Sequence, residues 1–252
     1  MRRKRALDIA SLLTLPLGIL IVLAAQWLEG GAPRALLQGP AALIVFGGTC
    51  AAVLVSYSPR EVRRAIRAVA ETFEHVSNDT DALMSRLIAI ASRAHRKGLM
   101  SLEAELNDVD HRLLRDGLML IVDGTSIEVL RDMVVADRRA RDADEEMPAR
   151  VFEAAAGYAP TLGILGAVLG LIEVMHHLSE PAALGSGIAV AFVATVYGVG
   201  AANLVFLPLA GRIRERAALA SRRRDLVAEA LFAIHARTNP RLVAHKLKVL
   251  SA

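Results

Sequence analysis

Two long apolar runs between residues 152 and 209 constrain the fold of this chain more than any other feature. Each run is long enough to cross a bilayer as a helix, which takes about 20 residues. The segment 180–187 separates the two runs, and it contains Pro181, Gly185 and Gly187, which are typical of turns. The sequence therefore predicts two antiparallel membrane-spanning helices joined by a short turn.

Small residues recur along both of these predicted helices. In lipid there is little hydrophobic force between helices, so residues that let two backbones approach closely are what drives association. We therefore expect a packing face on each helix, which assembles with the other helix and with further helices. The residues predicted to form these faces are Gly163, Gly166, Gly170, Ala194, Gly198 and Ala202.

Two further apolar runs, 7–28 and 36–57, lie in the first part of the chain. The chain is 54% hydrophobic and has a mean hydropathy of +0.41, which soluble domains rarely reach. The first run follows basic residues as a signal peptide would, but it is longer than a signal core and no small-x-small cleavage site closes it. The predicted fold class is all-α: a polytopic membrane protein with four transmembrane helices.

The predicted organisation has four parts. Residues 1–58 form transmembrane helices 1 and 2, and residues 152–210 form helices 3 and 4. Residues 59–151 are mostly charged and form a cytoplasmic helical domain inserted between helices 2 and 3. Residues 211–252 form a cytoplasmic basic helical tail.

The inserted domain opens with an amphipathic pattern. Ser58 is placed to be an N-cap and Pro59 to be the first helical residue, so a helix is predicted to begin here. Apolar residues then recur with helical spacing at Val62, Ile66, Val69, Ala70 and Phe73.

Basic residues set the predicted topology. Four of the first five residues are Lys or Arg, and the tail after Pro208 is densely basic, whereas the connection between helices 3 and 4 has no basic residue. Both termini and the inserted domain are therefore predicted to be cytoplasmic. Because the basic excess lies beside the predicted spans and 4% of residues are aromatic, we expect membrane lipid, and no nucleic acid, among the partners.

The sequence lacks the motifs of the common enzyme classes. It contains no Gly-x-Ser-x-Gly, His-Glu-x-x-His, Walker A or Gly-x-Gly-x-x-Gly pattern. His176 and His177 are adjacent and so point in different directions on a helix, which argues against a shared metal. The single cysteine, Cys50, excludes a disulfide within the chain. We therefore predict a protein that is not an enzyme and has no metal or cofactor.

Prolines and polar residues inside the predicted spans are the remaining features of interest. Pro160 and Pro208 each remove a backbone hydrogen bond and kink a helix, which suggests a hinge between the membrane and the cytoplasmic domain. Thr195 either bonds a neighbouring helix or lines an ion path. Glu173 lies near the outward end of its span, where a wet position is expected. No span has a centred Asp or Glu, so a titrating carboxylate would come from a partner.

Several motifs together resemble the A-subunits of flagellar stators (MotA/PomA type) in the MotA/TolQ/ExbB proton-channel superfamily. The resemblance covers nearly the whole chain, and four predicted spans favour the flagellar branch over ExbB and TolQ, which have three. The motifs that carry it are Phe46-Gly47-Gly48-Thr49, Arg96-Lys97-Gly98-Leu99 with Leu102-Glu103, Gly117-Leu118 and Val122-Asp123-Gly124.

The resemblance implies a ring of five such subunits in the bacterial inner membrane, around two copies of a single-span, peptidoglycan-binding B-subunit of MotB type. An Asp of the B-subunit would carry the ion, and the ring would exert torque on the rotor switch protein. The transported ion would be the proton, or alternatively sodium. Ala167 stands where sodium-type stators tend to carry threonine, which favours the proton.

The resemblance also assigns roles to individual residues. Pro160 and Pro208 match the stator prolines that couple ion passage to movement, and Thr195 matches a threonine of the ion path. The residues expected to contact the rotor are Arg96, Lys97, Glu103 and Glu105. Two alternatives stay open: an ExbB/TolQ-like subunit that energises outer-membrane processes, and a membrane scaffold that conducts no ions.

Overall fold

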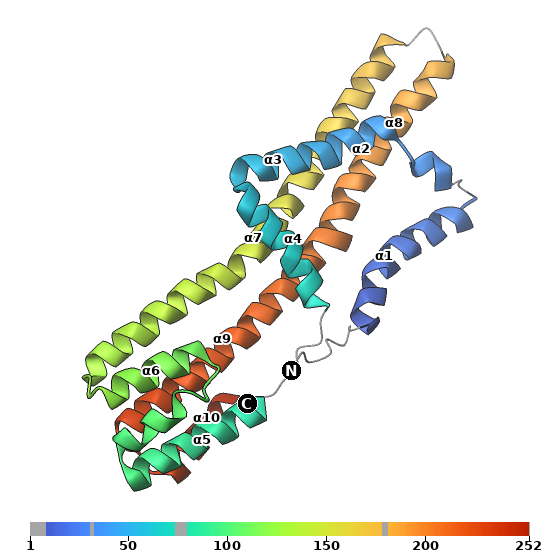
Figure 1. The fold of residues 1–252 in the computed structure, drawn as a ribbon. Coiled ribbons are helices and arrows are strands. Elements are labelled where there is room, and N and C mark those ends of the chain that lie inside the picture. Colours follow the sequence, from blue (N-terminus) through green and yellow to red (C-terminus); the bar gives the residue numbers. More distant parts are fainter. Residues whose placement is uncertain (1–8, 31–32, 74–79, 178–180, 252) are drawn as a thin grey trace. The chain divides into compact units, whose positions relative to one another are not determined.

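A computed structural model describes residues 9–30, 33–73, 80–177 and 181–251, and within these residues the secondary structure is entirely helical (Figure 1). Most helices are α-helices, η1 and η3 are 3₁₀-helices, and η2 and η4 are π-helices. In chain order the elements are α1 (Ile9–Leu28), η1 (Pro33–Leu36), α2 (Gly39–Ala42), η2 (Leu43–Gly47), α3 (Gly48–Ser56), α4 (Pro59–Thr72), α5 (Thr80–Lys97), η3 (Leu99–Glu105), α6 (Arg112–Val122), α7 (Ile127–His176), α8 (Pro181–Ala201), η4 (Ala202–Phe206), α9 (Leu207–His235) and α10 (Pro240–Ser251).

The chain divides into two compact units. Unit 1 comprises Met1–His75 and Glu146–Arg214, and unit 2 comprises Val76–Glu145 and Glu215–Ala252. Helices α7 and α9 each contribute residues to both units. The sequence predicted the inserted domain and the C-terminal tail as separate segments, and the structure brings most of both into unit 2. The division between membrane and cytoplasm at residues 58, 151 and 210 stays a prediction.

Unit 1 contains the helices that are suited to a membrane. Among the described residues, three stretches are long and apolar enough to cross a bilayer: Gly39–Ser56, which is α2, η2 and α3 in continuity, and segments within Ile127–His176 and Leu184–His235. The apolar stretch Pro16–Leu28 of α1 is shorter. The predicted start of the first span, residues 7 and 8, lies outside the described residues. The protein is thus a helical membrane protein, and the count of four spans stays a prediction.

The predicted turn of the hairpin is partly wrong. Helix α7 ends at His176 and α8 already begins at Pro181, so Gly185 and Gly187 lie inside α8 rather than in a turn. The physical reason is that proline is well suited to the first turn of a helix, where its missing N–H has no intrahelical partner to lose. Glycine is tolerated inside a membrane helix because it permits close contacts with a neighbouring helix, and these contacts stabilise the helix pair.

The π-helical segment η4 precedes Pro208. Proline has no N–H, and its ring crowds the carbonyl of the residue four positions back. The widened turn η4 lies directly before α9, where Pro208 is the second residue. A π-turn supplies space inside an otherwise regular helix and is frequent at functional sites. The helix therefore continues through the proline, with its irregularity absorbed by η4.

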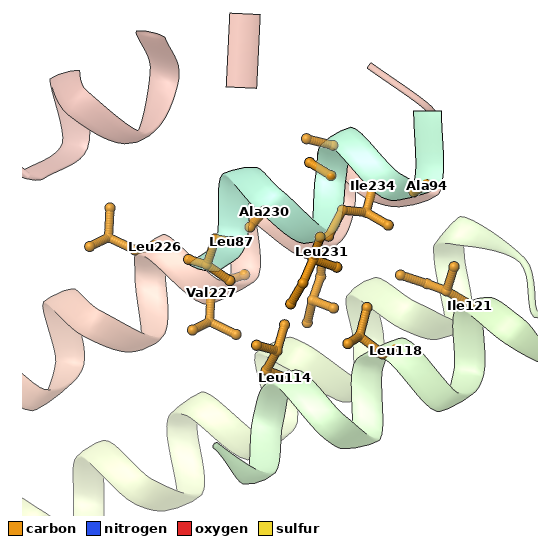
Figure 2. Close-up of a cluster of buried hydrophobic side chains, with 14 of the residues drawn as sticks. Leu87, Ala94, Leu114, Leu118, Ile121, Leu226, Val227, Ala230, Leu231 and Ile234 are labelled. Carbon is orange, nitrogen blue, oxygen red and sulfur yellow. The ribbon is translucent and has the colours of Figure 1, made fainter. Parts of the chain in front are cut away.

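Unit 2 is organised around a core of large aliphatic side chains from α5, η3, α6, α7, α9 and α10. Figure 2 shows the side chains of α6 directed toward those of α9, with Leu118 close to Leu231. A Cβ atom on Gly117 would lie 2.4 Å from Cδ1 of Leu231, so the missing side chain at this position makes room for Leu231. The largest fully buried side chains of this core are Leu87, Ile90, Leu102, Leu114, Leu118, Ile121, Leu130, Leu226, Leu231, Ile234 and Leu247.

Candidate functional site

Helices α7 and α8 lie side by side (Figure 1), and glycine residues of both helices lie at their contact. A Cβ atom on Gly198 would lie 2.5 Å from the carbonyl oxygen of Ala159, and one on Gly163 would lie 2.9 Å from the carbonyl oxygen of Ala194. Real Cβ atoms essentially never come closer than 3.0 Å to another heavy atom. The two backbones are therefore in direct contact where Gly163 faces Gly198.

A second backbone contact lies further along the same pair of helices. A Cβ atom on Gly170 would lie 2.9 Å from the carbonyl oxygen of Gly187, and one on Gly166 would lie 2.7 Å from Cβ of Ala194. Ala202, the remaining residue of the predicted packing faces, is buried at the start of η4. Gly187 also belongs to this contact, and the sequence missed it because glycine before an apolar run is equally typical of a turn.

Thr195 lies beside the glycine contact. Its hydroxyl group donates to the carbonyl oxygen of Ala191 at 3.3 Å, so its hydrogen bond is made within its own helix. The residue is exposed in the single chain. Asn203 likewise donates to Val199 within its own chain segment, at 2.9 Å. Each of these side chains therefore has a hydrogen-bond acceptor one helical turn back along the chain, and the role of Thr195 in an ion path stays a prediction.

On the side of α8 opposite to Thr195, Tyr197 is hydrogen-bonded to the connection between α1 and α2. Its hydroxyl group donates to the carbonyl oxygen of Leu36 and accepts from the backbone N–H of Gln38, at 3.3 Å. Its ring lies 5.4 Å from the ring of Phe46, centroid to centroid. Residues two apart on a helix differ by about 200° around its axis. Tyr197 thus fixes one face of α8 while Thr195 occupies the other.

The two prolines lie in different surroundings. Pro160 is half-buried inside α7, and a Cβ atom on Gly198 would lie 3.1 Å from its Cα. Pro160 is therefore part of the backbone contact between α7 and α8. Pro208 is exposed, and it lies at the start of α9 directly after η4. Their coupling role stays a prediction.

Three of the four residues predicted to contact the rotor are open to solvent in unit 2. Arg96 and Lys97 form the end of α5, and Glu103 lies in η3. Gly98, between the two helices, has a φ angle of +83°, which glycine adopts without strain. Glu105 differs from the other three, because it forms an ion pair with Arg93 and its side chain is 15% exposed.

An ion cluster around the buried Arg224 links α7 and α9 within unit 2. The side chain of Arg224 is 7% exposed, and its guanidinium group donates to both carboxylate oxygens of Glu145 and to Asp142, each at 2.7 Å. Next to it, Arg138 lies 2.7 Å from Asp225. The sequence shows a run of three arginines at 222–224, and nothing in that run indicates which one turns inward.

Burial and the interactions of the cluster shift the pKa values of Arg224, Asp142 and the nearby His111. Hydrogen bonds to Glu145 raise the pKa of Arg224, although burial opposes this. Burial would raise the pKa of Asp142, but hydrogen bonds from Arg224 and Ser221 and the charge of Arg224 outweigh it, so this pKa lies below its ordinary value. Burial and then the charges of Arg141 and Arg224 lower the pKa of His111. Arg224 therefore stabilises the ionised form of Asp142.

The described residues contain no group of His, Cys, Asp and Glu side chains that could hold a metal ion. What unit 1 offers instead is a pair of apolar helices in backbone contact, with a threonine beside that contact. Close packing through small residues is typical of helices that associate within a membrane.

Comparison with known proteins gives the family. Residues 105–225 match the MotA/TolQ/ExbB proton channel family. Motility protein A of Bacillus subtilis is 31% identical over 242 residues, which are 96% of this chain and 90% of that protein.

Two solved structures are similar over almost their whole length. The MotAB structure from C. jejuni has a TM-score of 0.87 and 26% identity, with 96% of this chain and 95% of that chain covered. The flagellar MotAB stator complex from Bacillus subtilis has a TM-score of 0.84 and 30% identity, with 95% and 94% covered.

The apolar stretches and the backbone contact between α7 and α8 thus define a multi-pass helical membrane protein. The chain belongs to the MotA/TolQ/ExbB proton channel family. Within this family its similarity to motility protein A and to flagellar stator structures identifies the flagellar stator branch, and not the ExbB or TolQ branch.

Proposed function

We propose that this chain, as a stator A-subunit, conducts protons together with a single-span B-type partner and converts the ion-motive force into torque on the flagellar rotor. The observation that carries the proposal is the whole-length similarity to a structure described as a flagellar MotAB stator complex, at 30% identity. The proposed location is the bacterial inner membrane, with both termini in the cytoplasm, and the proposed assembly is a ring of five A-subunits around two B-subunits.

The B-type partner would supply the titrating carboxylate. Glu173 is near the end of α7 and lies 3.3 Å from Nδ1 of His177, so it is not centred in its span. The apolar core of α8 contains no Asp or Glu at all. An intramembrane carboxylate on the partner, passing the exposed face of Thr195, would complete the ion path.

The proposed coupling runs from the ion path to the rotor. Pro160 lies within the contact between α7 and α8, and Pro208 follows the π-turn η4, so each marks a place where a helix departs from regular hydrogen bonding. In unit 2, Arg96, Lys97 and Glu103 are the exposed charges proposed to act on the rotor switch protein. Glu105 would act indirectly, by holding Arg93.

The choice of the proton over sodium rests on Ala167, which offers no oxygen to a sodium ion. We expect cells that depend on this chain to swim equally well in sodium-free and sodium-containing media. A proton uncoupler should stop them in both. Swimming that required sodium would contradict this part of the proposal.

Purification and site-directed variants test the function directly. The full chain, tagged at its C-terminus and purified in mild detergent from native membranes, should carry along a single-span protein that has an intramembrane Asp and a peptidoglycan-binding domain. A partner of ExbD or TolR type would overturn the flagellar function.

The ion path is tested at Thr195. Thr195→Val removes the hydroxyl group at nearly constant volume, and we expect complexes that assemble but do not support swimming. Thr195→Ser keeps the hydroxyl group and should retain swimming. Equal swimming with valine and with serine would remove Thr195 from the path.

A further inference from the structure

Helix α4 has a strongly basic face. At about 100° per residue, Arg60, Arg63, Arg64 and Arg67 fall on one side of the helix, and Val62, Ala65, Val69 and Phe73 fall on the other. These residues follow the second apolar span directly, since α3 ends at Ser56 and α4 begins at Pro59.

Most of the apolar face of α4 is already occupied within unit 1, and Ile66 is the exception, because it is 63% exposed. Ala65 is fully buried in a cluster with Val53, Val151 and Ala155. Phe73 is also buried, and the guanidinium carbon of Arg212 lies 5.5 Å from the centre of its ring. Because this face packs against protein, the basic face is the surface that α4 presents outward.

The charges on this outward face are largely uncompensated. Arg60, Arg63 and Arg67 are exposed, and they form no ion pair with any residue in the described part of the chain. Arg64 does have an interaction partner. Glu61 is committed to the helix cap, where its carboxylate accepts from the backbone N–H of Ser58 at 2.7 Å and from its hydroxyl group at 2.8 Å.

The start of α4 fixes where these charges lie. Tyr57 and Ser58 are extended, and a capping box between Ser58 and Glu61 holds the first turn of the helix. Arg60 to Arg67 covers about 10 Å of helix. The polar layer on each side of a bilayer is about 5–8 Å thick, and charges act over a further 8–10 Å at physiological salt. All three free arginines are therefore within reach of lipid headgroups.

We propose that the basic face of α4 is a binding surface for anionic phospholipid headgroups, formed by Arg60, Arg63 and Arg67. Clusters of arginine or lysine beside a transmembrane helix attract anionic lipid, and each charge near the surface strengthens binding by roughly fivefold. Three charges should together contribute on the order of 100-fold. The proposal needs only that the apolar stretch Gly39–Ser56 crosses the membrane, so it stands apart from the stator function.

The test uses the intact complex, purified in detergent and stripped of lipid. Phosphatidylglycerol is titrated against it, with phosphatidylcholine as the neutral comparison, and the shift of the thermal unfolding midpoint gives the half-saturating lipid concentration. For the wild type we expect half-saturation at least tenfold lower with phosphatidylglycerol than with phosphatidylcholine. The difference should shrink at high salt.

Three variants distinguish lipid binding at this surface from a general effect of the protein's positive charge. Arg60→Gln/Arg63→Gln/Arg67→Gln should raise the half-saturating phosphatidylglycerol concentration at least tenfold. Replacing the same three residues with lysine should preserve binding, because the positive charge is kept. The matched control is the set Arg139→Gln, Arg222→Gln and Arg241→Gln, which removes three exposed arginines of unit 2 and should bind as the wild type does.

The possible results decide the proposal in each case. It is overturned if the wild type does not distinguish the two lipids or if the glutamine triple variant of α4 keeps the wild-type preference. It is also overturned if the control set weakens phosphatidylglycerol binding as much as the glutamine triple variant of α4 does. If the triple variant fails to fold, Arg63→Gln alone is used, for which about a fivefold change is expected and no change contradicts the proposal. A preference for an acidic soluble protein over phosphatidylglycerol would likewise overturn it.

Discussion

Units 1 and 2 are both helical, but their helices are held together in different ways. In unit 1 the contact between α7 and α8 is backbone against backbone, with Gly163 facing Gly198. In unit 2 the core consists mainly of leucine and isoleucine side chains, together with valine and alanine, and an ion cluster around Arg224 lies beside it.

The predicted surroundings, lipid for the spans of unit 1 and water for unit 2, account for this difference. Water drives large apolar side chains together, so a core of leucines is stabilising in a unit that water surrounds. Lipid gives no such drive, and association then depends on close van der Waals contact between small residues. The same kind of substitution should therefore have different effects in the two units, and four predictions use this contrast.

The largest effect is expected at Arg224. Arg224→Met keeps much of the side-chain volume but leaves Asp142 and Glu145 without their buried partner. Removing one member of a buried pair costs about 3–5 kcal/mol, and because these carboxylates are 30% and 33% exposed, we expect the lower end of that range, about 3 kcal/mol. The free energy of unfolding of the full chain in detergent gives the measurement.

Arg222→Met is the control for this prediction, because Arg222 belongs to the same run of arginines, two positions before Arg224, but is exposed. It should change the free energy of unfolding by less than about 0.5 kcal/mol. If both variants behave alike, the cluster does not stabilise unit 2. The double variant Arg224→Met with Glu145→Gln should recover part of the loss, since one uncompensated charge is gone.

The second prediction applies one substitution to both units. In Gly198→Ala the new Cβ would meet the backbone carbonyl of Ala159, which cannot move without shifting α7, so we expect a loss of about 2–3 kcal/mol and failure of assembly. In Gly117→Ala the new Cβ would meet the end of the Leu231 side chain, which can change rotamer, so about 1 kcal/mol is expected. Oligomer yield and thermal midpoint measure both.

The control for the glycine comparison is Gly157→Ala. An added Cβ at Gly157 would meet nothing within 4 Å, and alanine favours the helix, so this variant should be neutral or slightly stabilising. If Gly198→Ala were as mild as Gly117→Ala, the backbone contact would not be what holds α7 and α8 together.

Much of the fold could be predicted from the sequence, because helical spacing and apolar length are local properties. The long apolar helices, the N-cap of α4 at Ser58 and the small residues of α7 and α8 all follow from such patterns. The turn at 180–187 was placed wrongly because glycine serves both turns and helix contacts, and only the partner helix decides between them.

The residues that sequence analysis missed depend on contacts between distant parts of the chain. Arg224 meets Asp142 across 82 positions, and Tyr197 meets Leu36 across 161. A rotation of 100° per residue separates the inward Arg224 from its neighbouring arginines, and that register is set by the packing of α9 rather than by local sequence. Glu105 is likewise less exposed than the other predicted rotor residues because it forms an ion pair with Arg93.

The third prediction concerns Tyr197, which supplies a polar contact to unit 1. Tyr197→Phe keeps the ring against Phe46 but removes the hydroxyl group that bridges Leu36 and Gln38. Hydrogen bonds between membrane helices contribute about 1 kcal/mol, so we expect a loss of about that size in the free energy of unfolding.

A change in the accessibility of the α8 face should accompany this loss. In a chain whose exposed Cys50 is replaced by alanine, a cysteine introduced by Thr195→Cys should react with a thiol reagent at a different rate when Tyr197→Phe is also present. Tyr158→Phe, which removes a hydroxyl group bonded to Ser56 at 2.9 Å, is the comparison variant. Equal labelling rates in both backgrounds would show that Tyr197 does not set the rotation of α8.

The smallest expected effect is a dependence of unit 2 on pH through His111. Burial lowers the pKa of His111 below the ordinary value of 6.5, and the charges of Arg141 and Arg224 lower it further. The folded state therefore resists protonation more than the unfolded state does. The contribution of His111 to stability is present above about pH 6.5 and is lost as the pH falls from there through the lowered pKa of the folded state.

His111→Asn tests this prediction with little other change. Nδ1 of His111 accepts from the backbone N–H of Leu114 at 3.4 Å as the N-cap of α6, and asparagine is an equally good cap that does not titrate. Between pH 7 and pH 5 the free energy of unfolding should fall by less than about 1 kcal/mol more in the wild type than in the variant. Carboxylates titrate mainly below this range, so parallel pH profiles would mean that His111 is not the group responsible.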